Sequence, residues 1–237
     1  MPEHMTAPVL IIGIHRSGTS LLTRMLEAIG LFVGNDLQAD HESLTMIELN
    51  NRYFMATNSS WDRPFYPTPA MQKNNIIRRT LDASVSVLQE HFGPVDGLWG
   101  FKDPRTLTTL PLWLEVFPEA PVIYIHRNEK AVARSLTKRH QRMIKKGIFP
   151  ADGDFQVGNL AFTQRCSDME GSLSFVHEQT SYFEALIQEG IVKDYHSLRY
   201  EDLLQNSEDE LLNLMTCLGL EASKEAVTRA LSLPRRD

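Results

Sequence analysis

The apolar positions predict two strand–helix units built alike. Residues 9–12 (VLII) are a continuous apolar run, which is typical of a strand buried on both faces of a sheet. A loop of small residues follows, and apolar residues then recur at helical spacing over residues 21–29 until Gly30 ends the pattern. The second unit has a similar run at residues 122–125 and a helical pattern over about residues 129–140. Strand, loop and helix in this order indicate a parallel α/β fold.

Weaker patterns extend this architecture along the chain. We expect further strands at residues 98–102 and 197–200, and helices at residues 74–91, between residues 157 and 189, and at residues 207–218 as the last element. Residues 58–69 and 145–154 are interpreted as loops, because prolines or polar residues interrupt the patterns there. No repeat or linker divides the chain, so residues 1–237 are predicted to form one three-layer α/β domain, a short parallel sheet flanked by helices.

The composition excludes several classes of protein. The chain carries 24 Lys and Arg against 30 Asp and Glu, a formal net charge of −6, whereas binding to nucleic acid or to an anionic membrane favours a basic surface. Any anion site must therefore be a local concentration of cations. The two cysteines fit neither a disulfide framework nor a zinc cluster and suit a reducing compartment. With no apolar run of about 18 residues and no signal-peptide segment before residue 9, we predict a cytoplasmic protein without a membrane span.

A candidate anion-binding loop joins the first strand to the first helix. Residues 13–20 (GIHRSGTS) lie where the free N–H groups and the positive dipole end of a helix N-terminus favour an oxyanion. Glycines let the backbone approach a ligand closely, hydroxyls add donors, and Arg16 adds charge and a forked donor set. The spacing from Gly13 to Gly18 matches the start of a Walker A loop, but Thr19 stands where that motif has its lysine. An ordinary nucleoside triphosphatase is therefore disfavoured.

Several segments together resemble the sulfotransferases. Residues 16–20 (RSGTS), straight after a buried strand, are similar to their 5′-phosphosulfate loop. Arg127 and Ser135 keep the eight-residue separation of their 3′-phosphate site, which has an arginine at a strand end and a serine in the following helix. Residues 102–105 (KDPR) resemble a segment of bacterial and tyrosylprotein members whose lysine acts at the transferred group. A late segment, residues 198–204 (LRYEDLL), is also similar to one in the family.

The resemblance implies a P-loop NTPase-like sulfotransferase fold and a donor, 3′-phosphoadenosine-5′-phosphosulfate. The enzyme would move the donor's sulfuryl group in line to a hydroxyl or amine of a small-molecule, glycolipid or carbohydrate acceptor. The implied donor-binding residues are Arg16, Ser17, Gly18, Thr19, Ser20, Arg127 and Ser135. Lys102, with Arg16, is implied to neutralise charge at the sulfuryl group and the leaving oxygen. No metal is predicted, because a sulfuryl group carries less negative charge than a terminal phosphate and cationic side chains suffice.

Two features of the family are missing, and two other functions stay open. The chain lacks the C-terminal R-x-G-x-x-G segment and the dimerisation motif of the cytosolic phenol and steroid branch. The remaining contacts to the 3′-phosphate and the formation of a homo-oligomer are therefore left open. A P-loop nucleotide kinase or other phosphotransferase is one alternative function. A nucleotide-binding relative without catalysis is the other.

An alcohol acceptor also needs a base within hydrogen-bond reach. Bacterial relatives carry N-x-x-G-x-x-E after the first helix, and the matching region here lacks the glycine. Glu42 is the first candidate for the base and His41 the second, with a solvated acidic loop as the alternative interpretation. His15, inside the anion loop, is interpreted as a packing residue, or as a support for the groups that contact the ligand, rather than as a base. We expect the acceptor to enter beneath a lid of residues 61–69, which is rich in aromatics, and of residues 145–154.

Overall fold

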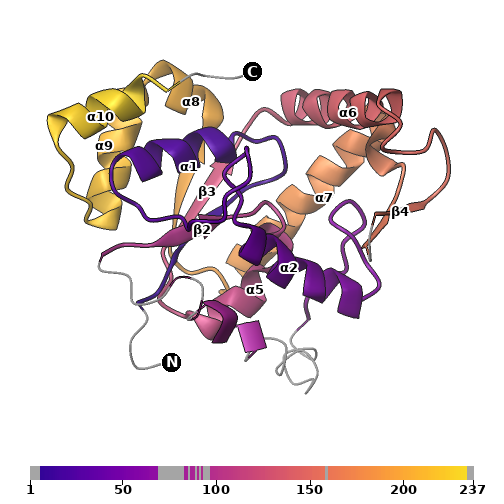
Figure 1. Cartoon of the computed structure of the whole chain (residues 1–237), viewed down its shortest axis with the longest axis horizontal. Helices are drawn as coiled ribbons and strands as arrows, with labels where there is room; N and C mark the ends of the chain where they lie inside the picture. The colour runs from indigo at the N-terminus through magenta and orange to yellow at the C-terminus, as the bar shows by residue number, and fades with distance from the viewer. Residues whose placement is uncertain are drawn as a thin grey trace.

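The protein is built around a short parallel sheet. The computed structural model describes residues 6–68, 83–84, 86–88, 90, 92, 97–157 and 160–233. The sheet has the order β2-β1-β3-β6 and consists of β1 (Val9–Ile12), β2 (Gly100–Lys102), β3 (Val122–His126) and β6 (Tyr195–Arg199) (Figure 1). Neighbouring strands all run parallel, so their carboxyl ends meet at one edge, where ligands gather in open α/β sheets. The predicted parallel sheet is confirmed.

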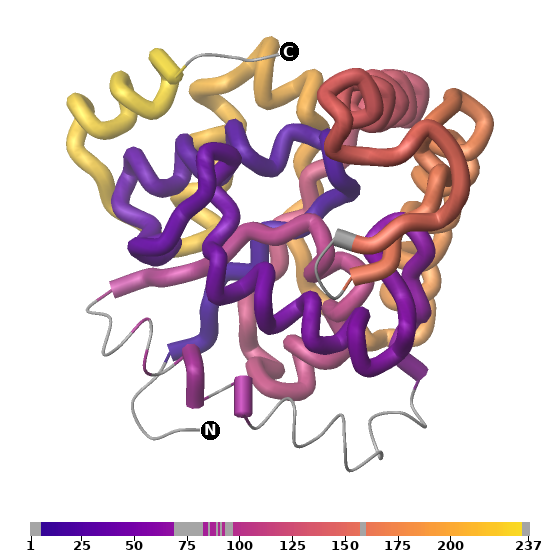
Figure 2. Tube along the Cα trace, turned by 45° about the vertical axis from the view of Figure 1, so that its right-hand side comes forward, coloured from indigo at the N-terminus to yellow at the C-terminus, as the bar shows by residue number. Residues whose placement is uncertain are grey.

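Helices cover both faces of this sheet (Figures 1 and 2). One face carries α1 (Thr19–Ala28), α8 (Tyr200–Gln205), α9 (Ser207–Leu218) and α10 (Lys224–Leu231). The other face carries α2 (Leu44–Ala56), α5 (Thr106–Val116), α6 (Glu129–Lys145) and α7 (Met169–Gln188). Successive side chains of β1 alternate between the two layers, since Ile11 packs in the first core and Leu10 in the second. The three-layer prediction is thereby confirmed.

The observed elements differ from the predicted ones in a few places. α9 begins and ends as predicted, but it is not the last element, because α10 follows with its N-terminus capped by the Ser223 side chain. The sequence patterns used above do not indicate α2, α5 or the hairpin of β4 (Phe155–Val157) and β5 (Leu160–Phe162). The predicted helix over residues 74–91 lies mostly outside the described residues, and a single domain over residues 1–237 stays a prediction. No helix within the described ranges is both long enough and apolar enough to cross a bilayer.

Candidate functional site

The loop after β1 is shaped to approach an anion. Gly13 lies where a Cβ would be 2.4 Å from the carbonyl oxygen of Ile125, so only glycine fits between the ends of β1 and β3. Arg16 and Gly18 have positive φ angles of 76° and 108°, which turns the chain sharply into α1. No side chain caps the N-terminus of α1, and the buried hydroxyl of Ser17 has no hydrogen-bond partner among the described residues. The loop therefore presents unused donors to a ligand.

The two predicted anion motifs meet at the carboxyl edge of the sheet. Arg16 Nε donates a hydrogen bond of 3.0 Å to Ser135 Oγ on α6, across 119 residues of sequence. Arg127 follows the end of β3, and its guanidinium lies 4.4 Å from the centre of the Tyr200 ring. The same ring lies against Gly18, since a Cβ there would be 2.2 Å from Cδ2 of Tyr200. Tyr200 thus lies between the first motif and the second.

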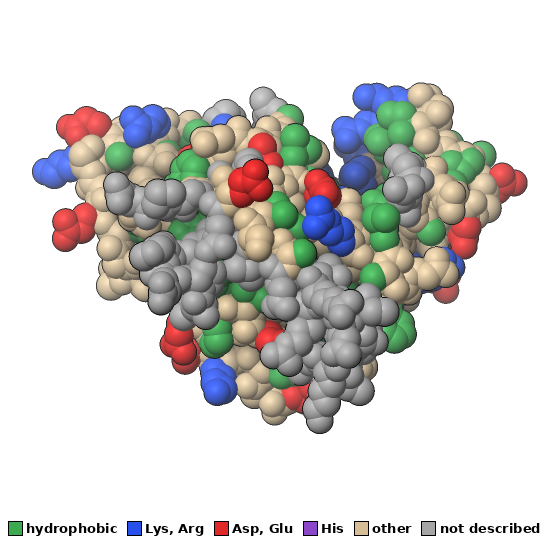
Figure 3. Space-filling view, turned by 60° about the horizontal axis from the view of Figure 1, so that its bottom comes forward, with side chains coloured by type: hydrophobic (Ala, Val, Ile, Leu, Met, Phe, Trp, Pro, Cys, Tyr) green, Lys and Arg blue, Asp and Glu red, His purple; other side chains and the backbone are tan. Residues whose placement is uncertain are grey.

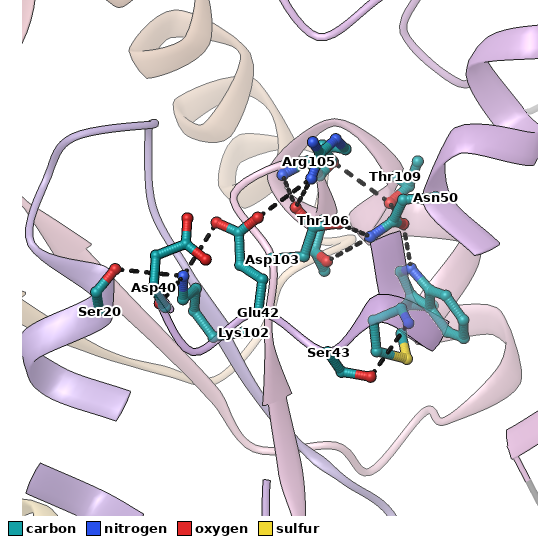
Figure 4. A network of polar contacts seen from close by, with 12 residues as sticks. Ser20, Asp40, Glu42, Ser43, Asn50, Lys102, Asp103, Arg105, Thr106 and Thr109 are labelled. Atoms are coloured by element: carbon teal, nitrogen blue, oxygen red, sulfur yellow. Dashed lines mark hydrogen bonds and ion pairs between the residues drawn. The ribbon is translucent and has the colours of Figure 1, made fainter. Parts of the chain in front are cut away.

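Lys102 brings the third motif to the same place (Figure 4). Its side chain is buried at the end of β2, and Nζ donates 2.7 Å to the carbonyl oxygen of Asp40. Nζ also lies 3.0 Å from Glu42 Oε1 and 3.4 Å from Ser20 Oγ in the first turn of α1. A single ammonium therefore connects the anion loop with the segment that holds the predicted base.

Glu42 is held between two cations, and His41 is not. One oxygen of the Glu42 carboxylate contacts Lys102, and the other lies 3.4 Å from Arg105 Nη1. Burial, reinforced by the nearby Asp103 carboxylate, raises the pKa of Glu42, although Lys102 and Arg105 oppose the rise. His41 instead places Nδ1 3.0 Å from a carboxylate oxygen of Glu27 on α1. Of the two predicted bases, the structure brings Glu42 into the site.

The side-chain amide of Asn50, whose hydrogen-bonding groups are all paired, connects this network to α2 and α5. Asn50 on α2 donates to Asp103 Oδ2 at 2.8 Å and to Thr106 at 3.0 Å. Its carbonyl accepts from Thr109 at 2.7 Å and from the Trp113 indole at 2.9 Å. Asp103 in turn accepts 2.9 Å from Arg105, the residue that reaches Glu42 (Figure 4). The sequence patterns do not indicate Asn50 because they do not indicate its helix.

Positive charge at this edge is left largely uncompensated. Within the described part of the chain, the arginines that form no ion pair here are Arg16, Arg127, Arg139 and Arg142. Burial, and after it the charges of Arg142 and Arg127, lower the pKa of Arg16. Figure 3 shows a notch along the upper edge of the molecule with Lys and Arg side chains on its right-hand wall, the side where α6 lies. A bound anion is the group that such a cluster lacks.

The aromatic residues of the predicted lid differ in their packing, and the lid itself stays a prediction. Trp61 is buried, with its ring 4.5 Å from that of His15 and 5.5 Å from that of Phe175. The Tyr66 hydroxyl donates 2.8 Å to Glu178 on α7, whereas Phe65 is half exposed. The His15 ring therefore packs on Trp61, which agrees with its interpretation as a packing or supporting residue. Among the residues with described positions, no group of three or more His, Cys, Asp or Glu side chains is arranged to hold a metal ion.

We compared the chain with models of protein families and with solved structures. The model described as "Sulfotransferase family" matches residues 8–224 of the chain. The chain is similar to sulfotransferase STF9 from Mycobacterium avium, with 13% identity, a TM-score of 0.58, and coverage of 95% of this chain and 67% of that one. It is also similar to a sulfotransferase from Alicyclobacillus acidocaldarius, with 12% identity and a TM-score of 0.55, over 96% of this chain and 94% of that one. A third similar structure is the sulfotransferase domain of the curacin biosynthetic pathway, with 17% identity and a TM-score of 0.53, over 94% of this chain and 77% of that one. These structures share its fold, and no curated protein matches the chain.

Proposed function

Because the chain belongs to the sulfotransferase family, we propose that it moves a sulfuryl group from 3′-phosphoadenosine-5′-phosphosulfate to a hydroxyl or amine. The acceptor would be a small molecule, a glycolipid or a sugar. The observation that carries the proposal is that three separate motifs converge at one sheet edge. Arg16 bonds Ser135, Ser20 faces Lys102, and Tyr200 lies between Gly18 and Arg127. A nucleotide with anionic groups on both its 5′ and 3′ positions needs two such anion sites on the same side.

The unused donors and unpaired cations fit this donor. The N-terminus of α1 and the Ser17 hydroxyl would hold the 5′-phosphosulfate, because they present N–H and O–H donors without partners among the described residues. Arg16, which forms no ion pair in that part of the chain and uses its Nε on Ser135, would add its charge and its remaining guanidinium N–H groups. The loop residues Gly18, Thr19 and Ser20 complete that cradle. Arg127 and Ser135 would hold the 3′-phosphate, to which an arginine can donate two parallel hydrogen bonds. The Tyr200 ring, which touches both Gly18 and the Arg127 guanidinium, would keep the two sites apart at a fixed distance.

Lys102 and Glu42 are the groups that would act during transfer. The donor supplies a sulfuryl group, whose bond to the bridging oxygen breaks as the acceptor oxygen bonds to sulfur. Lys102 would hold positive charge beside that oxygen, from a buried position where the charge is little screened. Glu42 would take the acceptor's proton, since its pKa is raised and its oxygens lie beside Lys102. Arg105 and Asp103 would keep the Glu42 carboxylate in place.

Donor binding is tested by thermal unfolding with 3′,5′-bisphosphoadenosine. A ligand at about 100 times its dissociation constant adds about 2.7 kcal/mol to the free energy of unfolding, which is a clear shift in Tm. Arg127→Ala should greatly reduce the shift. Arg134→Ala, an exposed arginine of α6, is the matched control and should keep it. Stabilisation by ATP with Mg²⁺, and none by the bisphosphate, would support a kinase instead.

Transfer is tested separately from binding. With radiolabelled donor and a panel of alcohols and amines, Lys102→Met should lower the rate of sulfation about 100-fold or more. It should still be stabilised by bisphosphoadenosine, because the proposed phosphate contacts are made by other residues. If the parent protein binds the bisphosphate and sulfates no member of the panel, the chain is a binding-only relative.

A further inference from the structure

One face of α6 carries cations beyond those that the donor needs. Ser135, Arg139 and Arg142 follow each other at spacings of four and three residues, so they lie on the same side of the helix. Because Ser135 accepts the hydrogen bond from Arg16, this side faces the anion loop. Arg139 lies one turn after Ser135, about 6 Å farther along the helix axis. It is therefore farther than Ser135 from Arg127, which precedes the helix, and so lies beyond both residues of the proposed 3′-phosphate site along α6.

Arg139 is partly buried among aromatic and cationic neighbours. Its guanidinium carbon lies 5.7 Å from the centre of the Trp61 ring, in the segment expected to cover the acceptor. Trp61 in turn packs on His15 of the anion loop. In the described part of the chain, Arg139 makes neither a hydrogen bond nor an ion pair. Burial, and after it the charges of Arg16 and Arg105, lower the pKa of Arg139, whereas the Glu42 and Asp40 carboxylates oppose this. A cation placed in this way lacks an anionic partner.

The acceptor is the ligand whose position matches. Arg139 is near enough to Glu42, the proposed base, and to Arg105, which contacts that base, for their charges to act on it. The nucleotide's anionic groups are already matched by Arg16, Ser135 and Arg127 in the proposed site. The His15 imidazole, whose Nε2 is buried without a partner, lies in the same positive surroundings, since Arg105 and Arg139 act on it. An anionic group entering beside Trp61 would meet these groups together.

We propose that Arg139 is a specificity residue that binds an oxyanion, a carboxylate, sulfate or phosphate group, on the acceptor. The substrate is then an alcohol or amine that is already acidic. The inference rests on the proposed function, because it assigns the second substrate of the same site. An acidic acceptor pairs with the guanidinium in a forked arrangement, whereas a neutral one leaves the cation desolvated and unpaired. The single arginine suits a small acid rather than a polyanion, in keeping with the net charge of −6.

The test compares acids with their neutral counterparts on the protein saturated with bisphosphoadenosine. The probes are 4-hydroxybenzoate against its methyl ester, glucuronate against glucose, and glycerol phosphate against glycerol, with Kd measured by ligand-observed NMR. In at least one pair the acid should bind at least tenfold more tightly than its counterpart. Arg139→Gln should reduce this preference to within about twofold, and Arg139→Lys should restore part of it. Arg134→Gln, which removes the same charge from the exposed side of α6, should leave the preference unchanged.

Other outcomes overturn the inference and distinguish it from the proposed function. If no acid binds better than its neutral counterpart, or if Arg139→Gln keeps the preference for acids, Arg139 does not bind the acceptor's anionic group. If Arg139→Gln weakens binding of bisphosphoadenosine, or of the sulfated donor alone, Arg139 belongs to the donor site. Each of these results leaves sulfuryl transfer standing. If bisphosphoadenosine does not stabilise the parent protein, the proposed function itself fails, and with it the assignment of an acceptor. Circular dichroism of each variant confirms that it is folded.

Discussion

Gly18 meets two separate constraints in the anion loop. Its φ of 108° is one that side chains rarely adopt, and an added Cβ would be 2.2 Å from a carbon of the Tyr200 ring. Gly30, with a φ of 110°, has the first constraint alone, because nothing lies within 4 Å of a Cβ there. The two glycines therefore separate backbone strain from a steric clash.

Gly18→Ala should destabilise the protein more than Gly30→Ala. We expect Gly30→Ala to lower the free energy of unfolding by about 1 kcal/mol through strain, and Gly18→Ala by about 3 kcal/mol because the Tyr200 ring must move. Urea unfolding of both variants measures the difference. Displacing Tyr200 should also weaken bisphosphoadenosine binding, which Gly30→Ala should not. Equal losses in the two variants would show that Tyr200 moves away at little cost.

His15 should make the stability depend on pH. Burial, followed by the charges of Arg105 and Arg139, lowers its pKa well below 6.5 in the folded protein. Below pH 6.5 the unfolded chain therefore binds a proton that the folded protein does not, so the free energy of unfolding falls as the pH falls. Between pH 7 and pH 5 the parent should lose up to about 2 kcal/mol more than His15→Gln. Urea unfolding at both pH values tests this, and parallel losses in the two proteins would contradict it.

Single residues of the candidate site can be predicted where a motif fixes both residue type and spacing. Arg16, Lys102, Arg127 and Ser135 all come to one edge, because each follows or faces the carboxyl end of a parallel strand. Arg139 was not predicted, since a lone arginine on a charged helix has no distinguishing spacing until Ser135 is known to face Arg16. The sequence left Glu42 and His41 both open as the base. His41 has a φ of 60°, a backbone conformation that no pattern in the sequence reveals.

At the scale of elements, amphipathic contrast decides what the sequence predicts. α1 and α9 alternate buried and exposed positions and end at glycines, so both were predicted. α5 has no such contrast, because residues 106–113 are all buried and Pro111 lies inside the helix, where proline usually signals a break. α2 carries a weaker signal, a capping Ser43 and then residues at helical spacing, and polar residues such as Asn50 share the buried face.

The contact between α2 and α5 depends on Asn50, and its loss should be costly. Asn50→Leu keeps a similar volume but leaves the Asp103 carboxylate, two threonine hydroxyls and the Trp113 indole without this partner in a buried site. We expect the free energy of unfolding to fall by about 3 kcal/mol or more. Urea unfolding measures the loss. Asn51→Leu is the matched control, because Asn51 Oδ1 has no hydrogen-bond partner, and it should change stability by only about 0.5 kcal/mol. Similar losses in both variants would mean that placing a leucine at this part of α2, and not the loss of the network, is responsible.

Across the whole molecule, the sign of the local charge at the sheet edge is opposite to that of the net charge. The chain has a net charge of −6, yet arginines without ion pairs in the described structure gather at the sheet edge from the loop after β1, the end of β3 and α6. Such an arrangement costs folding free energy, because like charges repel when no anion lies between them. It is retained, on the proposed function, because the same repulsion becomes attraction when the nucleotide binds. Stability of the free protein and affinity for the donor should therefore oppose each other.

Arg16 allows this opposition to be measured. Arg16→Gln removes one charge from the cluster and Arg16→Lys keeps it, while both replace a side chain at the same positive φ and lose the guanidinium bond to Ser135. At 50 mM salt, the ligand-free Gln variant should be about 0.5 kcal/mol more stable than the Lys variant by urea unfolding. At 500 mM salt the difference should shrink, because exposed charges are then screened. With bisphosphoadenosine the order should reverse, since only the Lys variant keeps the cation. A Gln variant that is no more stable than the Lys variant at low salt would show that nearby carboxylates such as Asp40 already neutralise the edge.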